Sequence, residues 1–159
     1  LTQLLEQPEP LFLILENLQD PGNLGTMIRT GEGAGITGVI MNSQTVDIFN
    51  PKTIRATMGS IFRVPFVYVP ELSPVLTQMH EKGIHTYAAH LKGKEYYDSF
   101  SFREPTAFLI GNEGNGLTKE ISDQSGQYLK IPMEGKVESL NASIAAALLM
   151  YEAHRQRNL

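Results

Sequence analysis

Three short stretches of this chain combine glycine with side chains that can bind a charged or polar ligand. They are Asn23-x-Gly25-x-x-x-Arg29, the segment Gly111-Asn112-Glu113-Gly114-Asn115-Gly116, and a segment that ends in Ser139-Leu140-Asn141-Ala142-Ser143. Arginine presents a planar fork of N–H donors to phosphate or hydroxyl oxygens, and glycine lets a ligand approach backbone amides closely. The simpler interpretations are a solvated arginine, a plain loop and a helix cap. A cap uses one polar residue, so three of them before one helix favour a binding site.

The hydrophobic pattern places these stretches between buried strands and helices. We expect strands at 11–15, 39–41, 62–69, 84–91, 107–110 and 128–131. We expect one helix from Asn23 or Leu24 to about Gly33, with Asn23 as its N-cap, and others at 51–55, 71–82, 117–123 and 139–156. This alternation predicts an α/β fold, a single domain with a mostly parallel sheet and helices on both faces. Ligand sites in such sheets lie beyond the carboxyl ends of the strands, where loops such as 16–23, 111–116 and 132–139 follow.

The composition is that of one globular domain. The chain has 159 residues, of which 42% are hydrophobic and 19% charged, and this excludes a disordered tail, a fibre and a coiled coil. Cysteine is absent, which excludes disulfides, thiolate zinc sites and a cysteine nucleophile. The net charge of −4 argues against a protein that coats nucleic acid without specificity, while a local basic patch is compatible with it.

The chain has no sequence signal for a membrane. No apolar run approaches the ~18 residues that a membrane span needs, and the run at 11–15 is too short for a signal sequence and lacks its basic flank. From the absence of cysteine we expect a cytoplasmic protein. The chain begins with Leu1 instead of methionine, so we expect a fragment of a longer protein with another domain upstream.

Two patterns that look like cofactor or metal motifs have the wrong context. Gly33-Ala34-Gly35-Ile36-Thr37-Gly38 matches GxGxxG, but a helix precedes it and a strand follows it, the reverse of a dinucleotide site. We predict a helix-ending turn there. His80-Glu81 is followed by a histidine five residues on, past Gly83, so the two imidazoles do not share a helix face as in a zinc protease. We expect no metal, and surface or packing roles for His80, His85, His90 and His154.

In order and spacing, the three stretches resemble the motifs of the SpoU (TrmH-like) RNA ribose 2′-O-methyltransferases of the SPOUT class. The motifs are similar to Asn23-x-Gly25-x-x-x-Arg29, to Gly111-x-Glu113-x-x-Gly116, and to Ile131-Pro132-Met133-x-Gly135-x-Val137-x-Ser139-Leu140-Asn141-x-Ser143. The resemblance runs from about Leu11 to the end of the chain. It departs from the family at Ala142, where valine is usual, and at Gly31 and Gly33, where alanines are common.

The resemblance implies a C-terminal segment threaded as a trefoil knot, a homodimer, and S-adenosylmethionine bound in the knot. It implies that the backbone at Gly111, Ile131, Met133 and Leu140 holds the adenosyl group, with 88–91 as a weaker candidate edge. Gly135 is expected to shape the same loop. A sulfonium is already an activated methyl donor, so this chemistry needs no metal.

The resemblance also implies roles for the polar residues. Arg29 would act on the phosphate and 2′-hydroxyl of the target nucleotide. Arginine keeps its proton at neutral pH, so we interpret Arg29 as a clamp that makes the hydroxyl more acidic, with phosphate or solvent as proton acceptor. Asn23, Glu113, Ser139 and Asn141 would orient Arg29 and the ribose. The form of the first motif favours ribosomal RNA over tRNA, and this subtype usually carries an upstream RNA-binding domain.

Three alternatives remain open beside ribosomal RNA methylation. They are a tRNA 2′-O-methyltransferase, a SPOUT-like domain that binds RNA or adenosylmethionine without catalysis, and a flavodoxin-like or Rossmann oxidoreductase. Intact Arg29, Glu113, Ser139 and Asn141 argue against the second. The misplaced glycines argue against the third.

Overall fold

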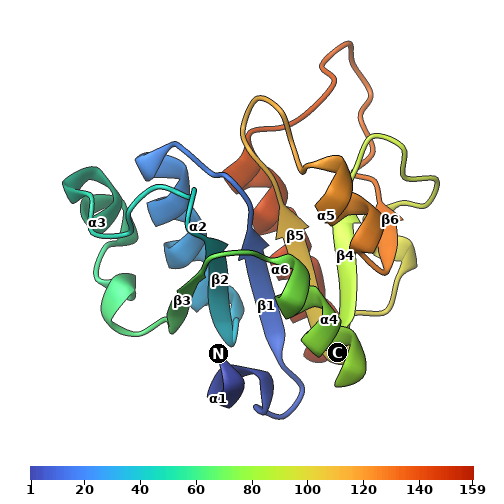
Figure 1. Ribbon diagram of the computed structural model, residues 1–159. Helices are drawn as coiled ribbons and strands as arrows, with labels where there is room; N and C mark the ends of the chain where they lie inside the picture. Colours follow the sequence, from blue (N-terminus) through green and yellow to red (C-terminus); the bar gives the residue numbers. More distant parts are fainter.

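The fold is built on six parallel strands in one sheet (Figure 1). The computed structural model describes all residues, 1–159. The strands are β1 (Leu11–Leu15), β2 (Gly38–Asn42), β3 (Phe66–Val69), β4 (His85–Ala89), β5 (Thr106–Ile110) and β6 (Gln127–Leu129), in the spatial order β3-β2-β1-β5-β4-β6. All the pairings between them are parallel. The predicted single α/β domain with a parallel sheet is therefore confirmed.

Helices cover both faces of the sheet, as predicted. They are α1 (Thr2–Leu5), α2 (Pro21–Ala34), α3 (Pro51–Thr57), α4 (Ser73–Glu81), α5 (Lys119–Gln124) and α6 (Ala142–Arg157), with 3₁₀ turns η1 (Ser60–Phe62) and η2 (Tyr97–Ser99). Every residue of β1 is buried, and its alternate side chains point to opposite faces. Leu13 packs in a core with α2 and α6, whereas Phe12 and Ile14 pack with α4 and α5. None of the helices is long and apolar enough to cross a membrane.

Two helix starts differ from the prediction. Helix α2 begins at Pro21, and its N-cap is Asp20, whose carboxylate accepts the N–H of Asn23 at 3.0 Å. Asn23 is therefore a first-turn residue and not the cap, because proline at the first helical position fixes the earlier start. Helix α6 begins at Ala142 and not at 139, since the Asn141 side chain caps it.

The predicted strand at 62–69 is also shorter in the structure. Met58 and Gly59 adopt left-handed conformations, with φ of 50° and 90°, and the chain then forms η1 before β3 begins at Phe66. The β-branched and aromatic composition of this segment is typical of a strand, but the preceding turn overrides it. The GxGxxG segment is a helix-ending turn as predicted, because Gly35 caps α2 with φ of 80°.

Helix α2 packs closely against α3 through Gly25. A Cβ on Gly25 would lie 2.5 Å from the Ala56 Cβ and 2.6 Å from the Thr53 carbonyl oxygen. Only glycine permits this approach, which sets α3 beside the first turns of α2. Helix α2 lies between α3 on one side and α6 on the other (Figure 1).

Candidate active site

The three motif-bearing loops lie at the carboxyl ends of the central strands. The loop 16–20 follows β1 and the loop 111–118 follows β5, and these two strands are neighbours in the sheet. The segment 130–141 follows β6 and leads into α6. This is the edge at which ligands of parallel α/β sheets bind.

Glu113 joins the second motif to the first. Its Oε1 accepts the backbone N–H groups of Asp20 at 2.8 Å and Gln19 at 3.1 Å, and its Oε2 also lies 3.1 Å from the Gln19 nitrogen. The carboxylate thus fixes the turn that starts α2, the helix that carries Arg29. Glu113 therefore contacts the backbone at the start of α2 and makes no hydrogen bond with the Arg29 side chain.

A second carboxylate, Glu16, also links these two loops, but here the acceptor lies in the loop after β1 and the donors lie in the loop after β5. Glu16 is only 5% exposed, and its oxygens accept the N–H of Thr118 at 2.7 Å and the Thr118 hydroxyl at 2.8 Å. Asn112 adds a third link, since its side-chain amide donates to the Asn17 carbonyl at 2.8 Å. Glu16 was not predicted as a site residue from the sequence, although a charged residue directly after five apolar ones is a signal for it.

Asn141 joins the third motif to the first. Its Nδ2 donates to Oδ1 of Asn23 at 3.2 Å, while its own Oδ1 accepts the Ser143 N–H at 2.8 Å and the Ser143 hydroxyl at 2.6 Å. The cap of α6 and the first turn of α2 are therefore in direct contact. Ser139 is exposed and forms no hydrogen bond, so the structure does not bring it to the other candidates.

Arg29 is exposed on α2 and makes neither a hydrogen bond nor an ion pair within the chain. It lies six residues after Asn23, on the helix whose first turn Glu113 and Asn141 hold in place. An arginine without an internal partner on a fixed helix keeps all its donors available for an external anion.

Gly111 makes the turn after β5 possible, because the loop folds back against it. A Cβ there would lie 2.1 Å from the Leu117 nitrogen and 2.2 Å from the Gly116 carbonyl carbon. Asn112 and Gly116 close this loop with two backbone hydrogen bonds of 3.2 and 2.8 Å. The need for glycine is thus confirmed, but its cause is the protein's own backbone. Gly135 differs, because a Cβ there meets no protein atom within 4 Å.

The segment 131–140 offers free backbone donors and acceptors. None of its N–H or C=O groups takes part in a hydrogen bond within the protein. Ile131, Met133 and Leu140 are half-buried beside these groups, and Ile131 also packs against the core. Apolar surface beside unpaired backbone amides fits the edge and face of an adenine-like ring.

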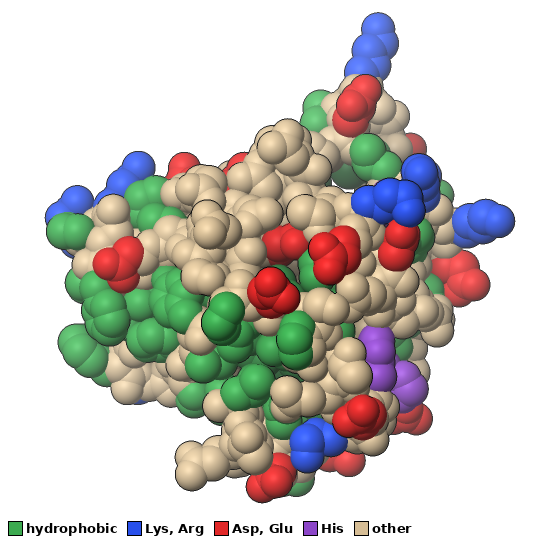
Figure 2. Space-filling model, in the orientation of Figure 1, with side chains coloured by type: hydrophobic (Ala, Val, Ile, Leu, Met, Phe, Trp, Pro, Cys, Tyr) green, Lys and Arg blue, Asp and Glu red, His purple; other side chains and the backbone are tan.

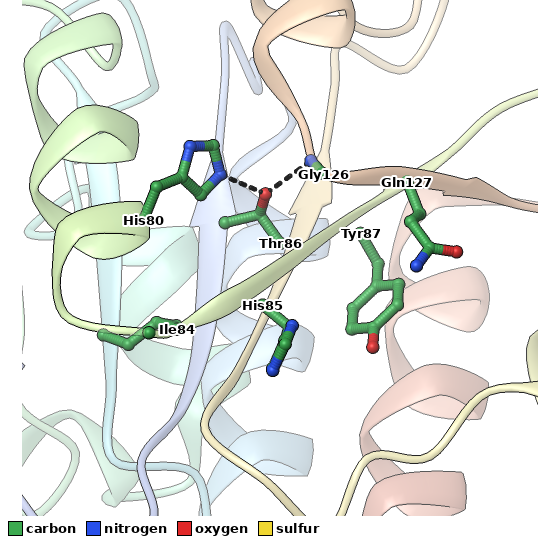
Figure 3. A pocket seen from close by; sticks show the side chains of 8 residues that line it. His80, Ile84, His85, Thr86, Tyr87, Gly126 and Gln127 are labelled. Carbon is green, nitrogen blue, oxygen red and sulfur yellow. Dashed lines mark hydrogen bonds between the residues drawn. The ribbon is translucent and has the colours of Figure 1, made fainter.

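A hollow of about 250 Å³ lies at the other end of the sheet, near the start of β4 and β6 (Figure 3). There His80 and the N–H of Gly126 bond the Thr86 hydroxyl at 2.8 and 2.7 Å. His85 pairs instead with Glu104 at 3.0 Å. These polar groups satisfy one another, and no three acidic or imidazole side chains form a metal-binding group.

Comparison with known proteins identifies the family to which this parallel α/β domain belongs. The SpoU rRNA Methylase family matches residues 10–151, so the chain belongs to this family. Among curated relatives, the putative TrmH family tRNA/rRNA methyltransferase YacO of Bacillus subtilis is 37% identical over 94% of this chain and 60% of its own length. The 23S rRNA (guanosine(2553)-2'-O)-methyltransferase RlmP of the same organism is 37% identical over 87% of this chain and 56% of its own.

Solved structures show the same fold. The SpoU methyltransferase AviRb from Streptomyces viridochromogenes, in complex with AdoMet, matches with a TM-score of 0.89 and 32% identity over 96% of this chain and 59% of its own. An AdoMet-bound rRNA methyltransferase from Sinorhizobium meliloti matches with a TM-score of 0.86 and 34% identity, over 96% and 59%. The chain spans about 60% of the length of several curated relatives that it matches.

Proposed function

We propose that the protein transfers a methyl group from S-adenosylmethionine to a ribose 2′-hydroxyl of RNA. The observation that carries the proposal is the joining of all three motifs around helix α2. Glu113 and Asn141 hold its first turn, and Arg29 projects from it without a partner. Membership of the SpoU family supports the same reaction.

The segment 131–140 and the turn at Gly111 are the residues that would hold the cofactor. The backbone groups between Ile131 and Leu140 have no partner in the protein and would hold the polar edge of the adenine, and the half-buried Met133 would lie against its face. When bound, S-adenosylmethionine supplies an activated methyl group. The proposal includes the trefoil knot implied by the resemblance. The knot would be formed by the C-terminal part of the chain, which contains the cofactor-binding segments after β5 and β6.

Arg29 binds the phosphate of the target nucleotide and the oxygen of its 2′-hydroxyl. The guanidinium carries a fixed positive charge, so it stabilises negative charge that develops on that oxygen. Solvent or phosphate then accepts the proton. Glu113, Asn23 and Asn141 position the helix. Ser139 is exposed before α6 and is free to contact RNA.

Ribosomal RNA is the substrate we favour over tRNA. The relative RlmP is named as a 23S rRNA 2′-O-methyltransferase, and the two AdoMet-bound structures include one named as an rRNA methyltransferase. Other relatives are named for both RNA classes. The first motif of this chain, from Asp20 to Gly25, favours the ribosomal branch.

The active form is a homodimer in this proposal. Ile144, Leu148 and Tyr151 follow one another at intervals of four and three residues on α6 and expose their apolar side chains. Tyr151 also packs over Gly33 of α2, where a Cβ would lie 2.6 Å from its hydroxyl oxygen. Gly33 lies one helical turn after Arg29 on α2, so a second copy bound to this apolar face would lie next to Arg29.

The experiment replaces Arg29 in the full-length protein. We expect Arg29→Ala to leave S-adenosylmethionine affinity unchanged by calorimetry and to slow transfer of tritiated methyl to unmodified ribosomal RNA by at least ~100-fold. Arg29→Lys should restore little, because an ammonium lacks the planar fork. Arg103→Ala is the matched control, because Arg103 lies before β5, at the end of the sheet away from the motif loops.

Three results would contradict the proposal. One is normal methyl transfer by Arg29→Ala. Another is failure of the unmutated protein to bind S-adenosylmethionine while it binds NADH or FMN, which would favour an oxidoreductase. The third is cofactor and RNA binding without transfer to either ribosomal RNA or tRNA, which would favour a binding domain without catalysis.

A further inference from the structure

One segment of this acidic protein carries only basic charge. Between Asp47 and Glu71 the chain has no acidic residue, but it contains Lys52, Arg55 and Arg63. The whole chain has a net charge of −4. The segment forms α3, η1 and β3, so its charge is concentrated on one side of the molecule.

The same segment exposes large apolar side chains. Phe62 is 87% exposed and Met58 is 68% exposed, and Phe49 and Ile54 are exposed beside them. Figure 2 shows a patch of hydrophobic side chains over α3 and the turn after it, with basic side chains at its upper edge and an acidic side chain between these and the patch. We call Lys52, Arg55, Met58 and Phe62 the α3–η1 shelf. Exposed aromatic side chains next to basic ones are typical of a surface that binds single-stranded nucleic acid.

The shelf runs alongside the helix that carries Arg29. The Lys52 side chain lies against Gly22, and Ala56 lies against Gly25. Further along, Ser60 and Arg63 both bond the carboxylate of Glu32, Ser60 at 2.6 Å. Along α2, Arg29 lies between Gly25, which contacts Ala56, and Glu32, which bonds Ser60. It is therefore level with the end of α3 and the start of η1.

The turn that presents Phe62 is held rigidly. Arg63 donates to both oxygens of Glu32, through Nε and, at 3.0 Å, through Nη2. The hydrogen bond from Arg63 holds the pKa of Glu32 at about 2, so this carboxylate stays charged at neutral pH. Val64 closes the turn on the Ser60 carbonyl at 3.0 Å. A side chain on a fixed turn loses little further freedom when it binds a ligand.

We propose that the α3–η1 shelf binds the single-stranded RNA that flanks the target nucleotide, an inference that rests on the proposed function. Lys52 and Arg55 contact phosphates, and Phe62 stacks on a base next to the one whose ribose faces Arg29. Met58 packs beside that base. The shelf acts on binding and not on chemistry, because it does not reach the reacting atoms except through the strand it holds.

A second copy of the chain is the alternative occupant of this surface. A two-fold contact centred on the shelf would bring Lys52 and Arg55 of one copy close to those of the other, and like charges in contact are unfavourable. RNA has the opposite charge. The apolar face of α6, formed by Ile144, Leu148 and Tyr151, suits the second copy better, because Arg155 beside it is already paired with Glu152 at 2.8 Å.

The first test measures binding of a labelled 12-nucleotide single-stranded RNA of mixed sequence by fluorescence anisotropy, with the full-length protein. We expect Phe62→Ala to raise the Kd at least fivefold, Phe62→Tyr to bind normally and Phe62→Leu to bind as weakly as Phe62→Ala, because only an aromatic ring stacks. Phe62 is 87% exposed, so these variants retain their fold. Normal binding by Phe62→Ala, or full rescue by Phe62→Leu, would overturn the stacking role.

The second test uses salt. Lys52→Gln and Arg55→Gln should each reduce the slope of log K against log[salt] by about 0.7, the value for one phosphate contact to a single strand. Lys82→Gln is the control, an exposed lysine at the end of α4 on the opposite face of the sheet, and its slope should not change. Slopes that stay unchanged in both shelf variants would refute the phosphate contacts.

Three further measurements separate this inference from the proposed function and from dimer formation. S-adenosylmethionine affinity should be the same in every shelf variant, and loss of methyl transfer should appear as a raised KM for RNA with kcat retained. If the unmutated protein transfers methyl and all shelf variants match it in KM, the inference fails and the proposed function stands. If Phe62→Ala becomes a monomer by sedimentation, the shelf is a contact between copies and the inference is wrong.

Discussion

Gly111→Ala tests whether the tight turn after β5 is required for cofactor binding. The new Cβ would lie 2.1 Å from a backbone nitrogen of the returning loop, so this loop must move outward by about 1 Å to reach an ordinary contact. Such a movement breaks the two backbone hydrogen bonds between Asn112 and Gly116. At roughly 0.5–1.5 kcal/mol each, their loss costs about 2 kcal/mol of unfolding free energy.

The assay follows stability and affinity in parallel. For a chain of this size, about 2 kcal/mol lowers the Tm by roughly 4–8 °C in scanning calorimetry. S-adenosylmethionine affinity should fall at least tenfold, about 1.4 kcal/mol, because Glu113 and Thr118 on the displaced loop lose their partners. Gly114→Ala is the control in the same loop, where a Cβ lies an ordinary 3.5 Å from its nearest neighbour. A Gly111→Ala variant with unchanged Tm and unchanged affinity would refute the reasoning.

Three other predictions follow from contacts outside this turn. Glu16→Gln should lower the unfolding free energy by about 1–3 kcal/mol in urea titrations, because a buried amide cannot accept from both donors of Thr118; an unchanged midpoint would contradict it. The Arg63 hydrogen bond lowers the pKa of Glu32 from 4.5 to about 2. The contribution of Glu32 to the unfolding free energy should therefore be fully present above pH ~4.5 and be lost between pH ~4.5 and ~2. Glu32→Gln should remove that part of the pH profile, and an identical profile in the variant would refute the link. If the protein forms the proposed dimer, Leu148→Glu on the exposed face of α6 should yield a monomer in light scattering. A monomeric unmutated protein would refute the proposed dimer.

The fold could be predicted largely from local pattern. Apolar runs such as 11–15 and 107–110 have the length and composition of buried strands, and their alternation with helical segments fixes a parallel sheet. The errors lie where a few residues decide a boundary. A left-handed turn at Met58 and Gly59 leads into η1, so the strand indicated by the composition at 62–69 begins only at Phe66. At Asp20-Pro21 a cap and a first-turn proline start a helix earlier than its apolar pattern begins.

The site was predictable as a set of residues but not as a set of contacts. The motifs mark Arg29, Glu113 and Asn141, yet the partners of Glu113 are backbone N–H groups more than 90 residues away. No local pattern encodes a hydrogen bond to a distant backbone, and for the same reason Glu16 escaped notice: its partner Thr118 is 102 residues away. Sequence spacing identifies which side chains are unusual, and only the fold determines what they touch.

The contacts divide the polar residues of the site into two groups with different consequences for the reaction. The side-chain oxygens of Glu113 and Asn141 accept backbone N–H groups at the starts of α2 and α6. In the proposed function these residues therefore influence methyl transfer through the position of those helices. The guanidinium of Arg29 donates no hydrogen bond within the chain, so its donors are available to an anion that binds at this site. Positioning by carboxylates and amides, and charge stabilisation by a free guanidinium, are therefore assigned to different side chains. In the proposed function this separation leaves the guanidinium of Arg29 unneutralised, because the Glu113 carboxylate already accepts backbone N–H groups at the start of α2.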